Sequence, residues 1–104
     1  MSKEPEEVVV VTRHEALVQF LSEEGVIPEG KPYVWKKHID PGENSKLVGK
    51  MVIGVLPMHL AALAREYVNV PLVIPPEMRG KELSIEEIRR FAKAAEHYEV
   101  RRTK

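Results

Sequence analysis

The chain has 104 residues, which is enough for one domain with its own core and too few for two. Sixteen basic residues balance sixteen acidic ones, so non-specific binding to long nucleic acid or to an anionic membrane is not expected. Cysteine is absent, which excludes disulfides, thiolate nucleophiles and zinc–sulfur sites.

The two ends of the chain differ in composition from the rest. Residues 1–6 form a polar leader and residues 99–104 a basic tail, with a single domain between them. The leader lacks the basic and apolar regions of a signal peptide, and no apolar run approaches the roughly 18 residues of a membrane span. We therefore expect a cytoplasmic protein with no membrane partner.

The first element is an unbroken apolar run, Val8–Val11, which predicts a strand buried on both faces. Thr12 and Glu15 match a capping box, so a helix is predicted to begin at Arg13 and to end at Gly25. The helix has one apolar stripe, made of Ala16, Leu17, Phe20 and Leu21.

Two further strands are predicted in the middle of the chain. Residues 33–39 carry Lys36 and Lys37, charges that suit the edge of a sheet. A turn-rich loop, residues 40–46, leads to a buried strand over residues 51–56. Pro57 then begins a helix. The buried face of that helix is predicted to contain Leu60, Leu63, Ala64 and Tyr67.

Residues 68–74 predict a fourth strand, and Pro71 within it points to an edge position. After a loop over residues 75–81, Ser84 and Glu87 form a second capping box. The helix that follows is predicted to carry His97 and to turn Ile85, Ile88, Phe91, Ala92 and Ala95 inward.

Because strands alternate with helices, the predicted fold is α/β with a mainly parallel, four-stranded sheet and right-handed crossovers. The most economical strand order is 2-1-3-4, which places the lysine-bearing and proline-bearing strands at the two edges. This is a minimal Rossmann-like sandwich of three layers.

Ligands of such sheets bind beyond the carboxyl ends of the strands, where the strand order reverses. That point lies between the first and third strands, and His38 and Asp40 end the second strand nearby. Cations and helix N-termini there predict a rim that binds phosphate groups. The predicted ligand-binding residues are Thr12, Arg13, Pro57, Met58, His59, Arg79, Gly80 and Lys81, and the predicted catalytic residues are Arg13, His14 and His59.

Several of these residues have a second interpretation. Thr12 is also a suitable helix N-cap, and Arg13 is also a suitable partner for a surface carboxylate. The histidines and Asp40 lack the spacing of a zinc site, so no metal or other cofactor is predicted. Glycine-rich phosphate loops of the dinucleotide and nucleoside-triphosphate enzymes are absent.

The segment "TRHE" after a strand is similar to the R-H-G motif of histidine phosphatases, whose histidine accepts a phosphoryl group. Glu15 stands where that motif has glycine. The resemblance implies an alternative in which His14 is a nucleophile.

A second resemblance covers nearly the whole chain. The segments "VTRHEALVQFL", "KHID", "GKMVIGVLPMHLAAL" and "PPEMRGKELSIEEIRRFAKAAEHYEV" resemble, in order and spacing, a small family encoded beside type III CRISPR systems. The resemblance implies a CARF-like fold and a ring nuclease that degrades cyclic oligoadenylate second messengers.

Cyclic tetra-adenylate, the ligand expected from this resemblance, has two-fold symmetry. A homodimer would hold it symmetrically, each subunit lending one set of Arg13, His14, His59 and Arg79, with residues 68–74 as the dimer element. Cleavage would use the ribose 2′-hydroxyl and no metal. A sensor or sponge that binds the messenger without cutting it is the other alternative.

Overall fold

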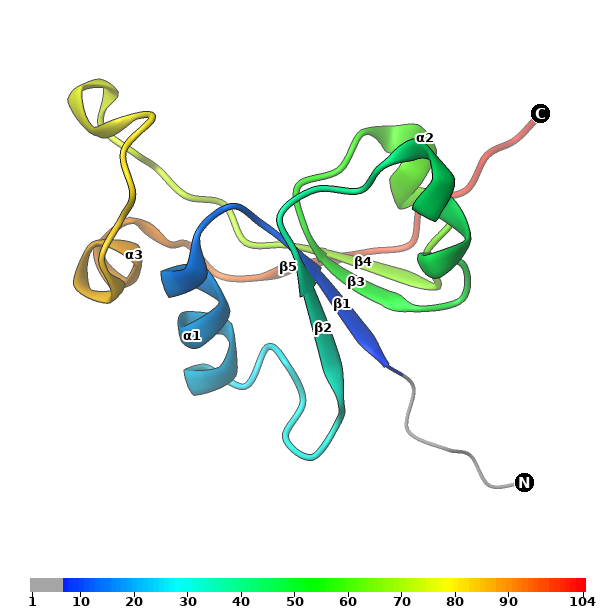
Figure 1. Cartoon of the computed structure of the whole chain (residues 1–104), viewed down its shortest axis with the longest axis horizontal. Helices are drawn as coiled ribbons and strands as arrows, with labels where there is room; N and C mark the ends of the chain where they lie inside the picture. Colours follow the sequence, from blue (N-terminus) through cyan, green and yellow to red (C-terminus); the bar gives the residue numbers. More distant parts are fainter. Residues whose placement is uncertain (1–6) are drawn as a thin grey trace.

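A computed structural model describes residues 7–104 as a mixed α/β structure built on one five-stranded sheet (Figure 1). The strands are β1 (Val8–Val11), β2 (Tyr33–Lys36), β3 (Met51–Gly54), β4 (Glu66–Asn69) and β5 (Glu96–Tyr98). Their order is β2-β1-β3-β4-β5, with the first four parallel and β5 antiparallel to β4. The predicted order of the first four strands is confirmed, and the fifth strand was not predicted.

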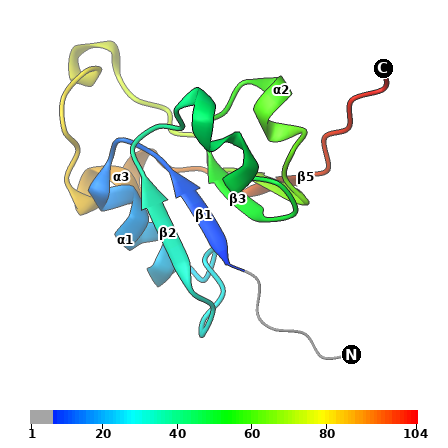
Figure 2. The same cartoon turned by 45° about the vertical axis from the view of Figure 1, so that its right-hand side comes forward.

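Helices cover both faces of the sheet. They are α1 (Glu15–Glu23), α2 (Met58–Ala61) and α3 (Ile85–Phe91), together with the 3₁₀ helices η1 (Pro41–Lys46) and η2 (Pro76–Met78). Helices α1 and α3 lie side by side on one face, and η1 and α2 lie on the other (Figures 1 and 2).

The core is built around β1, whose four valines are all buried. Because side chains alternate along a strand, Val8 and Val10 face α1 and α3, where they pack in a cluster that contains Leu21 and Ile88. Val9 and Val11 face the opposite layer. Their cluster contains Leu47, Val52 and Ala64. The prediction of a strand buried on both faces is confirmed.

Helix α1 begins later than the sequence predicted, at Glu15 rather than Arg13. The Thr12 amide still belongs to the sheet, because it donates to the Lys36 carbonyl at 3.0 Å. The Thr12 hydroxyl accepts a hydrogen bond from the His14 amide at 3.1 Å, and His14 takes the N-cap position. The predicted capping box at Thr12 is therefore wrong, since the chain needs two residues to leave the sheet.

Helix α2 is also shorter than predicted, because β4 starts early. The Arg65 amide donates to the Lys50 carbonyl at 2.8 Å, which aligns the chain with β3 from that point. Tyr67 is consequently a strand residue rather than part of a helix, and β4 ends at Asn69 instead of at residue 74.

The second predicted capping box is confirmed: Ser84 and Glu87 exchange hydrogen bonds at the start of α3. The helix nevertheless ends at Phe91, because Ala92 bridges to Leu72. The apolar residues Ala92 and Ala95 favoured a longer helix in the sequence. In the structure, Ala92 instead pairs with Leu72, in the segment that follows β4.

Strand β5 follows α3 and carries His97, whose ring pairs with the Glu66 carboxylate at 2.7 Å. It covers the edge of β4, so the predicted edge position of the proline-bearing strand is wrong. The hydrogen-bonding edge of the predicted dimer element is therefore occupied within the chain. The lysine-bearing strand β2 lies at an edge, as predicted.

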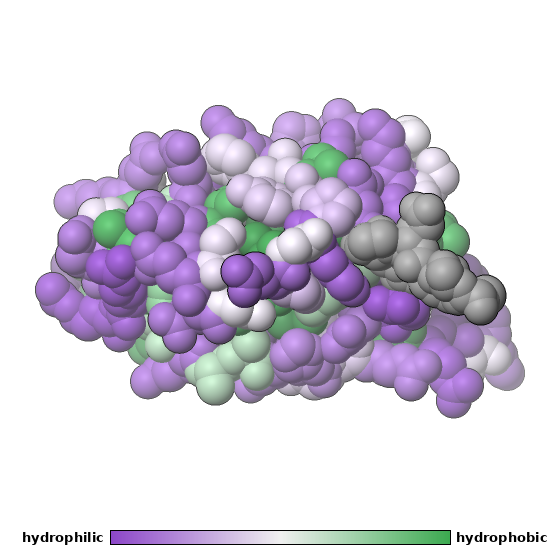
Figure 3. All heavy atoms as spheres, turned by 90° about the horizontal axis from the view of Figure 1, so that it is seen from below, coloured by the Kyte–Doolittle hydropathy of each residue, from purple (hydrophilic) through white to green (hydrophobic). Residues whose placement is uncertain are grey.

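The face seen in Figure 3 is mainly hydrophilic, with hydrophobic atoms showing in recesses between polar side chains. Large apolar side chains that are exposed include Val55 and Met58, close to the carboxyl end of β3. No helix within residues 7–104 is long and apolar enough to cross a membrane.

Candidate functional site

The carboxyl ends of β1, β2 and β3 surround a hollow of about 460 Å³, which we call the Arg13 hollow. Its lining residues are Val11, Thr12, Arg13, His14, Lys37, His38, Ile39, Val55, Leu56, Pro57 and Leu60. They include two cationic side chains and two imidazoles and no carboxylate. The volume is within the range of about 300–1,000 Å³ that is usual for ligand pockets.

Thr12 fixes the path of the chain into this hollow. Its amide donates to the Lys36 carbonyl, and its carbonyl accepts a hydrogen bond from the Trp35 indole N–H at 2.8 Å. With the bond from the His14 amide to its hydroxyl, Thr12 is held at three atoms. Thr12 therefore positions the two residues that follow it instead of capping the helix.

Arg13 is exposed, and no carboxylate within residues 7–104 pairs with it. The alternative interpretation, a surface ion pair, is therefore not found in the described part of the chain. His14 is half-buried at the N-cap of α1, with its backbone extended. The charge of Arg13 and the partial positive charge at the start of α1 both favour an anionic ligand here.

The turn after β3 forms the opposite wall. Gly54 has a φ of +146°, and a Cβ at this position would lie 2.0 Å from the Val11 carbonyl oxygen. The Tyr67 hydroxyl donates to the Gly54 carbonyl at 2.6 Å and accepts from the Leu56 amide at 3.0 Å. These contacts hold the turn against β1, and Pro57 lines the hollow as predicted.

The third wall is the connection after β2. Glu43 accepts a hydrogen bond from the Lys36 ammonium at 2.6 Å and from the Asp40 amide at 3.2 Å. The contact with Lys36, reinforced by that with the Asp40 amide, lowers the pKa of Glu43 to about 2. His38 in turn contacts the Asp40 carboxylate at 3.0 Å. This network fixes the segment that brings Lys37 and His38 to the hollow.

Lys37 is the residue of the hollow that sequence analysis assigned only to a sheet edge. The sequence could have indicated Lys37, because it stands next to His38 at the carboxyl end of β2. The parallel pairing of β1 with β2 brings that end close to the carboxyl end of β1. Trp35 and Tyr67 were missed as positioning residues because their hydrogen bonds join segments that are far apart in the sequence.

Met58 and His59 do not line the Arg13 hollow. They belong to α2, and they line a separate hollow with Arg101 and Arg102 of the tail. Helix α2 has only four residues, too few for the aligned dipole that was expected to help bind an anion.

The loop after η2 is also apart from the Arg13 hollow. Arg79, Gly80 and Lys81 line neither that hollow nor the one beside α2. Their loop runs beside α3, at the far end of the molecule from α2 (Figure 1). The structure therefore brings together Thr12, Arg13, His14 and Pro57, and the role of the other predicted residues stays a prediction.

A smaller hollow of about 290 Å³ lies on the other side of His14. Its lining is mainly apolar and includes Leu17, Ile53, Pro71 and Leu72. His14 and Thr12 line both hollows, so the segment after β1 separates a cationic space from an apolar one. In the described part of the chain no three His, Cys, Asp or Glu side chains are grouped to hold a metal ion.

A comparison with known protein families shows to which family the chain belongs. The family model described as "Putative CRISPR-associated protein (Cas_VVA1548)" matches residues 9–101. The chain belongs to this CRISPR-associated family. The matched span contains every residue that lines the Arg13 hollow. No match was found among curated proteins or among solved structures.

Proposed function

We propose that this CRISPR-associated protein is a ring nuclease that binds and cleaves cyclic oligoadenylate, with cyclic tetra-adenylate as its substrate. The observation that carries the proposal is the grouping of Arg13, His14, Lys37 and His38 around one hollow without a carboxylate, in a chain of zero net charge. Membership of a CRISPR-associated family and the resemblance of the "TRH" and "VIGVLPMHLAAL" segments support it.

The two hollows beside His14 suit the two chemical parts of a nucleotide. Arg13 and Lys37 offer charge-assisted hydrogen bonds to phosphate oxygens. The apolar hollow lined by Leu17 and Leu72 accommodates a base. A two-fold dimer would present two such sets to a ring that has two-fold symmetry.

Cleavage in this proposal is a displacement within the ligand. A ribose 2′-hydroxyl attacks the adjacent phosphorus, the bond from phosphorus to the 5′-oxygen breaks, and a 2′,3′-cyclic phosphate and a 5′-hydroxyl result. One base takes the 2′-hydroxyl proton and one acid gives a proton to the leaving oxygen. Imidazole is suited to both roles near neutral pH, and His14 and His38 share the hollow.

The protein supplies geometry and charge to this reaction. Holding the 2′-oxygen in line with the leaving oxygen removes much of the entropic cost of the step. Arg13 and Lys37 stabilise the negative charge that grows on the phosphoryl oxygens. His59 lines the separate hollow beside α2, so within one subunit His38 is the histidine that accompanies His14.

Incubation of the protein with cyclic tetra-adenylate, with and without EDTA, followed by chromatography of the products, tests the proposal. We expect linear di-adenylate ending in a 2′,3′-cyclic phosphate, formed at the same rate with EDTA. Uncut ligand that co-elutes with the protein would instead indicate a sensor or sponge. Release of inorganic phosphate from a monoester would indicate the histidine-phosphatase alternative.

A further inference from the structure

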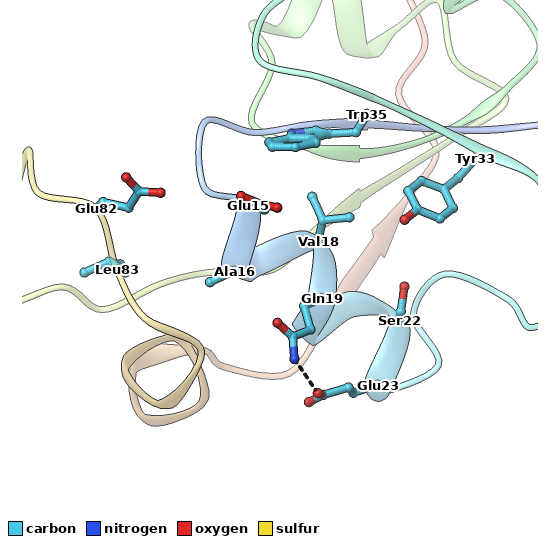
Figure 4. Close-up of a pocket in the computed structure, with 10 residues that line it drawn as sticks. All are labelled: Glu15, Ala16, Val18, Gln19, Ser22, Glu23, Tyr33, Trp35, Glu82 and Leu83. Atoms are coloured by element: carbon cyan, nitrogen blue, oxygen red, sulfur yellow. Dashed lines mark hydrogen bonds between the residues drawn. The ribbon is translucent and has the colours of Figure 1, made fainter.

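A hollow of about 580 Å³ lies between α1 and the edge strand β2, and it has no part in the proposed function. We call it the acidic groove. Its lining residues are Glu15, Ala16, Val18, Gln19, Ser22, Glu23, Tyr33, Trp35, Glu82 and Leu83 (Figure 4). Three are carboxylates, two are aromatic, and none is a lysine, an arginine or a histidine.

The aromatic side chains of the groove come from a strand with one open side. In Figure 4, Tyr33 and Trp35 extend from β2 on the side of α1. Val8 and Thr12 of β1 donate to the carbonyls of Pro32 and Lys36. Since backbone groups alternate along a strand, the carbonyls of Tyr33 and Trp35 point to the free edge of the sheet. The groove thus lies beside backbone groups that can pair with an added strand.

Two of the three carboxylates of the groove are available to a cation from outside residues 7–104. Glu23 is already paired with Arg89 at 2.7 Å, and the Arg89 contact lowers the pKa of Glu23. Glu15 and Glu82 are exposed and make no ion pair within residues 7–104. Cations also bind favourably to the faces of tyrosine and tryptophan rings. An extended segment that carries arginine or lysine therefore fits this surface.

The chain contains such a segment at the opposite edge of its sheet. Residues 101–104 follow β5, are exposed, have no regular secondary structure, and include Arg101, Arg102 and Lys104. Arg101 and Arg102 line the hollow beside α2, and in Figures 1 and 2 the segment ends on the side remote from α1 and β2. In this structure the Arg102 guanidinium donates to the Lys104 carbonyl. When the segment is added to a sheet as an extended strand, Arg102 and Lys104 point to the same side, as side chains two residues apart do.

The segment cannot occupy the groove of its own molecule. Residues 99–104 extend over at most about 20 Å. Crossing from β5 to β2 spans four strand spacings, or about 19 Å, before the layer of α1 and α3 is passed. A segment 101–104 that reaches the groove therefore comes from another molecule.

We infer that the acidic groove binds residues 101–104 of a second copy of this chain, with that segment added beside β2. Arg102 and Lys104 of the second copy lie against the carboxylates of Glu15 and Glu82. Groove and segment are different surfaces at opposite sheet edges, so the contact is head-to-tail and extends into rings or linear chains. None of its residues lines the Arg13 hollow, so the inference is independent of the proposed function.

Sedimentation velocity at low salt over a concentration series tests this inference without any ligand. Wild-type protein is expected to show species that grow with concentration and dissociate at high salt. The groove variant, Glu15→Gln with Glu82→Gln, and the segment variant, Arg102→Gln with Lys104→Gln, should each lose that growth. An equimolar mixture of the two should form a dimer that grows no further, because one variant retains an intact segment, the other retains an intact groove, and the groove and segment left free in that dimer are both altered.

Trp35 supplies a second readout, because it is the only tryptophan of the chain and it lines the groove. A peptide of residues 99–104 should change its fluorescence, with a dissociation constant at least about tenfold higher for the groove variant. The control, Glu29→Gln with Glu77→Gln, neutralises two exposed carboxylates outside the groove and should behave as wild type. Assembly that survives in both variants, a mixture that forms no dimer, or an unchanged Trp35 signal would overturn the inference.

Discussion

Arg13 has a charge that no carboxylate neutralises over residues 7–104, and it follows a residue held by three hydrogen bonds. Replacing Arg13 by alanine should weaken the binding of cyclic tetra-adenylate by about 1.5–3 kcal/mol, the usual contribution of a hydrogen bond to a charged group. Calorimetry measures this difference. The control is Arg90→Ala, an exposed arginine whose guanidinium lies 5.7 Å from the centre of the Phe91 ring on α3. Equal affinity of the two variants would contradict the assignment of Arg13 to the ligand site.

Gly54 ends β3 beside the Arg13 hollow, and its backbone lies close to that of Val11 in β1. Alanine there would place a carbon 2.0 Å from the Val11 carbonyl oxygen, at a φ that side chains disfavour. We expect Gly54→Ala to lower the free energy of unfolding by at least about 2–3 kcal/mol. Denaturant unfolding should show no comparable loss for Gly42→Ala, where an added carbon meets no atom within 4 Å. Equal stability of the two variants would contradict the close approach of β3 to β1.

At the scale of elements, the turn between β3 and α2 depends on a residue of β4. Tyr67→Phe removes one donor and one acceptor from that turn, so the free energy of unfolding should fall by about 1–3 kcal/mol. The matched control is Tyr33→Phe, since Tyr33 is 44% exposed. A thermal unfolding series compares them. Indistinguishable midpoints would show that the Tyr67 hydroxyl does not hold the turn.

The connection between β2 and β3 has a pH dependence that follows from Glu43. Its pKa is lowered to about 2, whereas in the unfolded chain Glu43 takes up a proton near pH 4.5. The stability it contributes is therefore present above about pH 4.5 and is lost as the pH falls from there toward about 2. Glu43→Gln should be less stable at pH 7 and should lose less stability over that interval.

Unfolding measured at a series of pH values checks this prediction. Glu77→Gln removes an exposed carboxylate on η2 and should leave the acid transition as it is in the wild type. A Glu43→Gln protein with the wild-type acid transition would show that the contacts of Glu43 with Lys36 and Asp40 contribute nothing.

The parallel strands were predictable because their signal is local. The four valines of β1 and the lysines at positions 36 and 37 were sufficient to place both strands. The order of the first four was predicted correctly. One of its two cues, Pro71 as the mark of an edge strand, was wrong because β5 covers β4. The end of α3 and the strand β5 were not predictable, because Ala92 leaves the helix to pair with Leu72, which lies twenty residues earlier in the sequence. The same limit applies to the site: Arg13 and His14 follow a recognisable strand, whereas Lys37 joins them only through the pairing of β1 with β2.

The whole molecule has zero net charge, but its acidic and basic side chains are separated between two hollows. The Arg13 hollow has no acidic lining residue, and the acidic groove has no basic one. Trp35 connects them, since its side chain lines the groove and its indole N–H holds the Thr12 carbonyl beside the hollow.

In the proposed function His14 transfers a proton during cleavage of cyclic oligoadenylate in the Arg13 hollow. The most direct test of this role is the single-turnover rate of cyclic tetra-adenylate cleavage by His14→Ala, compared with wild type and with His97→Ala. His97 lies on β5 outside the hollow, so its variant should cleave at the wild-type rate. For His14→Ala we expect a rate lower by about 10²–10⁴-fold but still measurable, because positioning and cationic stabilisation remain. A wild-type rate for His14→Ala, or a phosphohistidine at His14 detected by mass spectrometry, would contradict it.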